Sequence, residues 1–189
     1  ITDTSLAIQG IIGRASQLRQ SKNILQTTKE FQKGHVIYLR GAAGVGKTHF
    51  INTLSELAQT ENFAVCSLAI FESSTTKRDI LQELVKQLIS KLGHNDQDST
   101  IDLHDLFQKE NFTDEQESYI YSLLDISNPN QSIQDKSHYS TRVRSEVAIL
   151  VNLITKLNAA VTIIIDDIHW ADDSLLIMLN TLTAEIRTL

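Results

Sequence analysis

Apolar and polar positions follow two different periods along the chain, and each period predicts one kind of element. Short apolar runs rich in β-branched residues predict three strands, at residues 35–39, 62–70 and 160–166. The third run carries three consecutive Ile residues, which is typical of a strand buried on both faces. Apolar positions at helical spacing predict four helices, at residues 47–59, 80–92, 143–157 and 173–189. Gly93 can end the second of these helices, and Asp172 or Asp173 can cap the last.

Strands that alternate with helices predict an α/β fold with a parallel sheet and right-handed crossovers. The middle of the chain is more polar, with short amphipathic pieces such as "LHDLF" and "YIYSLL" and a loop around "SNPNQSIQDKS". We therefore expect four parts in one domain: an N-terminal segment, a core, a helical insertion, and a last part with helix, acidic strand and helix. Their bounds are residues 1–34, 35–94, 95–140 and 141–189.

The composition is that of an ordinary globular domain, with 189 residues, 41% hydrophobic and 21% charged. The net charge of −6 and the lack of a Lys or Arg run argue against a nucleic-acid-binding surface in this segment. The single Cys66 cannot form an internal disulfide, which favours a reducing, cytoplasmic setting. No apolar stretch approaches the roughly 20 residues that a membrane span needs, so we expect no membrane partner. The chain begins at Ile1, and we expect it to be a piece of a longer protein.

The stretch "GAAGVGKT" at residues 41–48 fits the pattern G-x-x-x-x-G-K-[ST] (Walker A) at every specified position. Glycines let successive backbone N–H groups point at phosphate oxygens, and the helix that follows adds the positive end of its dipole. Lys47 would neutralise the β- and γ-phosphates, and the Thr48 hydroxyl would bind Mg²⁺. Three of the seven glycines lie in these eight residues, between a predicted strand and a helix, which favours a phosphate loop over a plain turn. The phosphate-binding candidates are Gly41, Ala42, Ala43, Gly44, Val45, Gly46, Lys47, Thr48 and His49.

The stretch "VTIIIDDIHWADD" at residues 161–173 places two carboxylates at the end of a buried strand, where they are costly unless they have a partner. A nucleotide with bound Mg²⁺ provides one. Asp166 is the candidate Mg²⁺ ligand through a bound water, and Asp167 could orient or deprotonate the water that attacks the γ-phosphate. The two roles are separable if neighbouring strand residues point in opposite directions. The alternative is a strand end followed by a helix cap.

Together, "GAAGVGKT" and "IIIDDIHWADD" resemble the signal-transduction ATPases with numerous domains, the STAND branch of the AAA+ superfamily. They resemble most closely the ATPase modules of large bacterial transcription activators and of multidomain cyclase and kinase regulators. The segment "IIGRASQL" is similar to that family's G-R-E-x-E-L motif, although Ala15 and Gln17 stand where acids are usual. The resemblance implies ATP and Mg²⁺ as cofactors, with Ile12, Gly13 and Arg14 beside the adenine.

The resemblance also implies a P-loop NTPase fold of the AAA+ or ASCE type, truncated here after the acidic (Walker B) strand and the following helix. A further strand would lie between that strand and the phosphate-loop strand. Lys47 and Asp167 are then the catalytic candidates, and Thr48 and Asp166 the metal candidates. His169 either lies in solvent at the turn or contacts the γ-phosphate or the attacking water. Trp170 is expected to pack at the strand-to-helix corner.

The leading hypothesis is a slow ATPase that acts as a regulatory switch in a larger signalling or transcription-regulating protein. The alternatives are a nucleotide-dependent scaffold with little turnover, a DNA-remodelling AAA+ ATPase and a small-molecule kinase. Asp167 discriminates between the first two, because a pure scaffold needs no second acid. The expected partners are ATP or ADP and other domains of the same chain, with a homo-oligomer as an open alternative.

Overall fold

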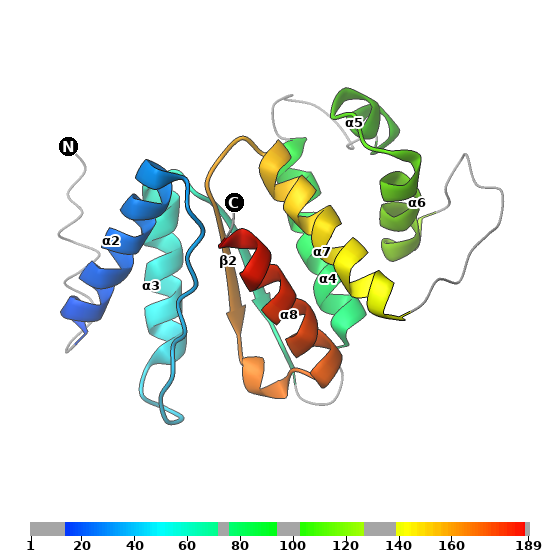
Figure 1. Ribbon diagram of the computed structural model, residues 1–189. Coiled ribbons are helices and arrows are strands. Elements are labelled where there is room, and N and C mark those ends of the chain that lie inside the picture. Colours follow the sequence, from blue (N-terminus) through cyan, green and yellow to red (C-terminus); the bar gives the residue numbers. More distant parts are fainter. Residues whose placement is uncertain (1–13, 72–75, 94–102, 127–138, 188–189) are drawn as a thin grey trace.

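Two parallel strands lie at the centre of the molecule, between helices on both sides (Figure 1). They are β1 (Ala64–Ala69) and β2 (Val161–Asp166), and their register runs from Ala64 opposite Val161 to Ala69 opposite Asp166. Two of the three predicted strands and the parallel arrangement are therefore confirmed. The computed structural model describes residues 14–71, 76–93, 103–126 and 139–187.

The four predicted helices are confirmed, and three further helices are present among the described residues. Helices α2 and α3 lie side by side on one face of the sheet, and α4, α7 and α8 cover the other (Figure 1). A short 3₁₀ turn, η1 (Ile168–Trp170), joins β2 to α8. The helices are α2 (Ala15–Phe31), α3 (Lys47–Thr60), α4 (Lys77–Leu92), α5 (Leu103–Lys109), α6 (Asp114–Leu123), α7 (Tyr139–Lys156) and α8 (Asp173–Ile186).

The sheet separates two hydrophobic cores, because successive residues of a strand face opposite sides. In β1, Cys66 and Leu68 are buried in the larger core with α4 to α8, while Val65 packs against the smaller core with α2 and α3. The smaller core is built around Leu18 of α2 and Phe50 of α3, which are 1% and 2% exposed. The phosphate loop, which leads into α3, is thus attached to the smaller core, while Val161, Ile163 and Ile165 of β2 pack against the larger one.

The predicted strand at residues 35–39 is not formed, and this prediction is wrong. A strand needs a neighbour for its backbone hydrogen bonds, and among the described residues β1 and β2 pair only with each other. The segment is instead held by side chains: Thr28 Oγ1 lies 2.9 Å from His35 Nδ1, and Leu39 packs against the smaller core. Ile37 and Tyr38 are 41% and 62% exposed.

The predicted insertion is helical where the structure describes it, and α5 and α6 share the larger core with α4 and α7. Phe107 lies at the centre of this contact, with its ring 5.1 Å from that of Phe112 and 5.5 Å from that of Tyr121. Arg78 of α4 donates to the carbonyl of Ser122 at 2.7 Å and pairs with Asp125 at 2.6 Å. These contacts fasten α6 to α4. The predicted loop at residues 127–137 lies outside the described residues.

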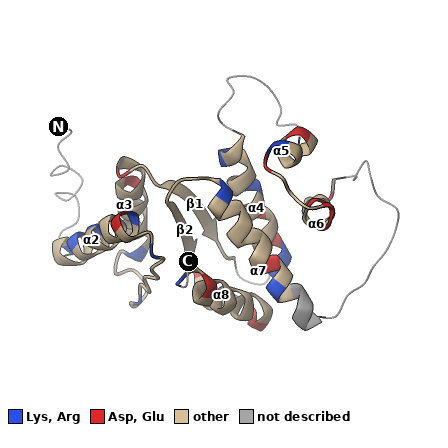
Figure 2. Cartoon of the chain, turned by 45° about the horizontal axis from the view of Figure 1, so that its top comes forward, with Lys and Arg blue, Asp and Glu red and all other residues tan. Residues whose placement is uncertain are grey.

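Acidic and basic residues occur together on some of the helices, α4 and α7 among them (Figure 2). Helix α4 carries Lys77, Asp79 and Glu83, and α7 carries Arg144 and Glu146, so each helix has both signs of charge. One pair is buried: Lys77 Nζ lies 2.8 Å from Glu146 Oε2.

Candidate functional site

The loop at residues 41–48 turns from the segment before it into α3 by means of two left-handed glycines. Gly44 has φ 76° and Gly46 has φ 83°, values that side chains with a Cβ rarely adopt. No atom lies within 4 Å of a Cβ placed on either glycine. The loop therefore presents an exposed backbone that a ligand can approach closely.

The N-terminus of α3 is left open by the residue that precedes it. Gly46 is its N-cap and offers no side-chain hydrogen bond, whereas Thr76, Thr113 and Asp172 cap α4, α6 and α8 with their side chains. The prediction of a cap on α8 is confirmed for Asp172, which accepts from Leu175 N at 2.7 Å. The first N–H groups of any helix lack intrahelical partners, and they carry the positive end of its dipole. At α3 this arrangement suits an anion such as a phosphate.

The Lys47 side chain folds back over the loop. Its ammonium group donates to the carbonyl oxygens of Gly41 at 3.2 Å and Ala42 at 3.0 Å. A Lys ammonium has three donors and no acceptor, and a phosphate oxygen is a stronger partner than a carbonyl oxygen because it is charged. Lys47 is thus held over the loop, where a phosphate could replace its present acceptors.

Thr48 and Asp166 come together although they are far apart in sequence. Thr48 Oγ1 donates to Asp166 Oδ2 at 3.2 Å, which joins the first turn of α3 to the end of β2. The other carboxylate oxygen of Asp166 accepts from Asp167 N at 2.9 Å. A hydroxyl beside a carboxylate is a suitable donor set for Mg²⁺, which keeps several waters and takes few protein ligands. Within the described ranges, no group of three His, Cys, Asp or Glu residues converges on one point.

Asp167 does not continue the strand. Strand β2 ends at Asp166, and Asp167 has φ 56°, a left-handed conformation in which Asp and Asn are enriched among residues with a Cβ. The argument from strand alternation is therefore wrong here, because the chain turns into η1 at this residue. Asp167 Oδ1 lies 3.7 Å from His169 Nδ1, and the two side chains are 50% and 64% exposed.

The N-terminal motif meets the phosphate loop through Arg14. Its guanidinium donates to the carbonyl oxygen of Val45 at 2.5 Å, so the start of α2 contacts the middle of the loop. The sequence argument assigned Arg14 to the adenine and missed this contact, which joins residues 31 positions apart and leaves no local signal. Ile12 and Gly13 lie outside the described residues.

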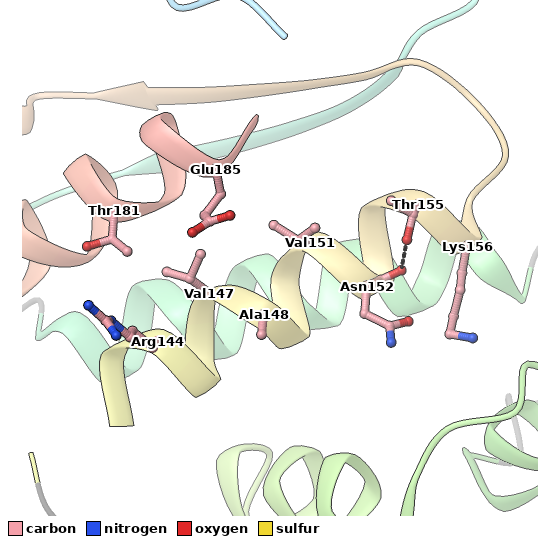
Figure 3. Close-up of a pocket in the computed structure, with 9 residues that line it drawn as sticks. All are labelled: Arg144, Val147, Ala148, Val151, Asn152, Thr155, Lys156, Thr181 and Glu185. Carbon is pink, nitrogen blue, oxygen red and sulfur yellow. Dashed lines mark hydrogen bonds between the residues drawn. The ribbon is translucent and has the colours of Figure 1, made fainter. Parts of the chain in front are cut away.

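A separate groove of about 660 Å³ runs between α7 and α8 (Figure 3). It contains no residue of the phosphate loop and none of the turn at residues 166–170. Arg144 lines this groove, and Lys47 does not. The residues that line it are Arg144, Val147, Ala148, Val151, Asn152, Thr155, Lys156, Thr181 and Glu185.

The fold and this arrangement define an α/β P-loop NTPase. The sequence model of the AAA ATPase domain matches residues 11–188, which is nearly the whole chain. The chain belongs to the AAA ATPase domain family, and this membership indicates nucleotide binding. No curated protein and no solved structure in these comparisons matches the chain. In the part of the chain that the structure describes, no helix is both long and apolar enough to cross a membrane.

Proposed function

We propose that this chain is an ATP-binding and slowly ATP-hydrolysing switch module of a larger signalling or transcription-regulating protein. The observation that carries the proposal is the 3.2 Å hydrogen bond from Thr48 to Asp166, which joins the phosphate loop to the acidic end of β2. Family membership supports nucleotide binding. The resemblance of "IIIDDIHWADD" to the STAND ATPases supports the regulatory part of the proposal.

The proposed nucleotide contacts follow from the donors around the loop. Backbone N–H groups of residues 41–49 bind the phosphates, and Lys47 exchanges its two carbonyl acceptors for β- and γ-phosphate oxygens. Thr48 and Asp166 hold Mg²⁺, with a water between the metal and Asp166. Residues 12–14 border the base. When bound, Mg²⁺ and ATP supply the transferable phosphoryl group and the cation that neutralises its charge.

Asp167 is proposed to orient or deprotonate the attacking water. It follows the proposed metal ligand Asp166 directly, and its carboxylate is half exposed, so a water can reach it. The nucleotide-dependent scaffold is the second candidate function. It is favoured by the left-handed turn at Asp167, which ends the strand and so removes the strand alternation on which a separate role for this second acid was based.

We also propose that β2 gains a second neighbour in the whole protein. Among the described residues β2 pairs only with β1, and residues 35–39 have no strand partner, although they lead directly into the phosphate loop. A strand between them would satisfy the backbone groups of both. The resemblance to AAA+ modules supports this arrangement. Other domains of the same chain, or further copies of it, are the proposed partners of the switch.

Nucleotide binding and single-turnover hydrolysis test the proposal, with wild type compared with Asp167→Asn and Lys47→Ala. Asn tolerates the left-handed conformation of residue 167, so this variant removes the base without bending the turn. We expect wild type and Asp167→Asn to bind a fluorescent ATP analogue equally. The hydrolysis rate of Asp167→Asn should fall by about 10²- to 10⁴-fold, the usual contribution of a general base. Lys47→Ala should lose most of the binding.

Each outcome selects one function. Binding by both proteins with ADP formed only by wild type supports the switch ATPase. Binding by both without hydrolysis by either replaces it with the scaffold. If folded wild-type protein does not bind ATP, the assignment of the phosphate loop is wrong.

A further inference from the structure

The turn that carries Asp167 has a fixed backbone. Trp170 N donates to the carbonyl of Asp167 at 3.0 Å, and Ala171 N donates to that of Ile168 at 3.1 Å. The turn ends at Asp172, which caps α8, and Leu175 in the first turn of α8 is fully buried. The turn is held by β2 on one side and by a capped helix on the other, so its side chains can rotate more freely than its backbone can move. The position of the Asp167 carboxylate therefore depends on its side-chain neighbours.

The neighbour of that carboxylate is the imidazole of His169. Nδ1 of His169 lies 3.7 Å from Oδ1 of Asp167, and the ring of His169 packs against Trp170 with centroids 4.8 Å apart at 39°. An exposed pair of this kind contributes little to stability. Since the His169 side chain is 64% exposed, it contributes little to the stability of the fold.

We propose that His169 is a positioning residue for Asp167 in ATP hydrolysis. A proton on Nδ1 of His169, donated to Oδ1 of Asp167, fixes the rotation of the carboxylate and leaves Oδ2 to accept a hydrogen bond from water. In this structure the 3.7 Å separation is too long for a hydrogen bond. Hydrogen bonds of catalytic groups are often long without substrate and shorten in the substrate complex. Both side chains are exposed and can rotate through the remaining distance.

This inference rests on the proposed function, and three substitutions of His169 test it on the full chain. His169→Asn places an amide N–H close to the position of Nδ1, His169→Gln moves the donor one bond further out, and His169→Leu removes it. We expect His169→Leu and His169→Gln to lower the single-turnover rate about tenfold, the order expected from a misplaced catalytic group, without a change in ATP affinity. His169→Asn should retain at least half of the wild-type rate.

Trp170 provides a readout that does not depend on turnover, because it is the single tryptophan of the chain and its ring contacts His169. Addition of Mg²⁺ and a non-hydrolysable ATP analogue should change its emission in wild type as the His169 ring moves toward the carboxylate. In Asp167→Gly, which keeps the left-handed backbone but has no carboxylate, this change should be lost. A change of equal size in both proteins contradicts the proposal.

The remaining outcomes separate this inference from the proposed function. Wild-type rates in His169→Leu, or equal losses in His169→Leu and His169→Asn, overturn the positioning role. If Asp167→Asn is inactive while His169→Leu is unaffected, only the inference fails. If Asp167→Asn hydrolyses ATP at the wild-type rate, the proposed base is wrong and the positioning role falls with it. The double variant Asp167→Asn with His169→Leu should hydrolyse ATP no more slowly than Asp167→Asn alone, because His169 acts through Asp167.

Discussion

The buried ion pair between Lys77 and Glu146 joins the first residue of α4 to the middle of α7. Lys77 Nζ lies 2.8 Å from Glu146 Oε2, and the side chains are 13% and 2% exposed. Replacing Lys77 with Met keeps an apolar stem of similar shape but removes the cation. Glu146 would then stay buried while it loses the Lys77 cation, and a buried carboxylate that loses a charged partner is costly.

The magnitude follows from the burial of Glu146. Removing one partner of a buried pair costs about 3 to 5 kcal/mol, because the remaining charge has lost its solvation and its counter-charge. Since Lys77 is partly exposed, water can reach its place, and we expect the lower end of this range, about 3 kcal/mol. In Lys77→Met with Glu146→Leu, both charges are gone and the apolar surfaces of α4 and α7 can close. The double variant should therefore lie within about 1 kcal/mol of wild type.

Urea unfolding followed by circular dichroism measures both effects. The midpoint should fall in Lys77→Met and return in the double variant, while the slope of the free energy against urea stays constant. Lys86→Met, on the same helix, is the matched control for the loss of one positive charge. The reasoning is refuted if Lys77→Met costs no more than this control, or if the double variant is as unstable as the single one.

Three further predictions follow from local contacts. The backbone of Ser67 exchanges two 3.0 Å hydrogen bonds with the side-chain amide of Gln87, so Gln87→Ala should expose this edge of β1 and increase self-association. Light scattering at rising protein concentration measures this, and an unchanged signal contradicts it. Burial raises the pKa of the Cys66 thiol, so iodoacetamide should label native protein far more slowly than unfolded protein; equal rates contradict this. Hydrogen bonds from the backbone N–H and hydroxyl of Thr76 lower the pKa of Asp79. Their stabilisation is present above the unfolded pKa, near 3.9, and is lost as the pH falls through the lower folded value. Because Asp79 is exposed and solvent screens its charge, Asp79→Ala should cost at most about 1 kcal/mol at neutral pH and less in strong acid. A cost independent of pH would contradict this.

The helices could be predicted from the sequence because their signals are local. Apolar positions at helical spacing predicted α3, α4, α7 and α8, and the acidic residues at 172 and 173 predicted the cap of α8, which is Asp172. Helix α2 was not predicted. Its buried residues are only Leu18, Ser21 and Leu25, so its apolar stripe is too sparse to distinguish it from a polar segment.

Features that depend on distant partners could not be predicted in the same way. Residues 35–39 have the composition of a strand, but a strand forms only when a neighbour accepts its backbone hydrogen bonds. The left-handed turn at Asp167 depends on how β2 ends and η1 begins, and Asp and Asn adopt positive φ too rarely for the residue type to predict it. The pairing of Thr48 with Asp166 was expected from the two motifs together, whereas the contact from Arg14 to Val45 has no sequence signal.

The position of the two cores bears on the proposed switch. Thr48 lies in the first turn of α3, which packs in the smaller core with α2, whereas Val161, Ile163 and Ile165 of β2 pack against the larger core. The hydrogen bond between Thr48 and Asp166 thus joins a helix of the smaller core to a strand that also borders the larger one. It is an exposed hydrogen bond, and such a bond contributes little to stability by itself. A ligand that binds Thr48 and Asp166 at once would set the distance between α3 and β2. A ligand that binds only the phosphate loop would not. In the proposed switch, a difference of one phosphate group becomes a difference in the arrangement of α3 relative to β2, because the two states differ in which part of the molecule the ligand contacts.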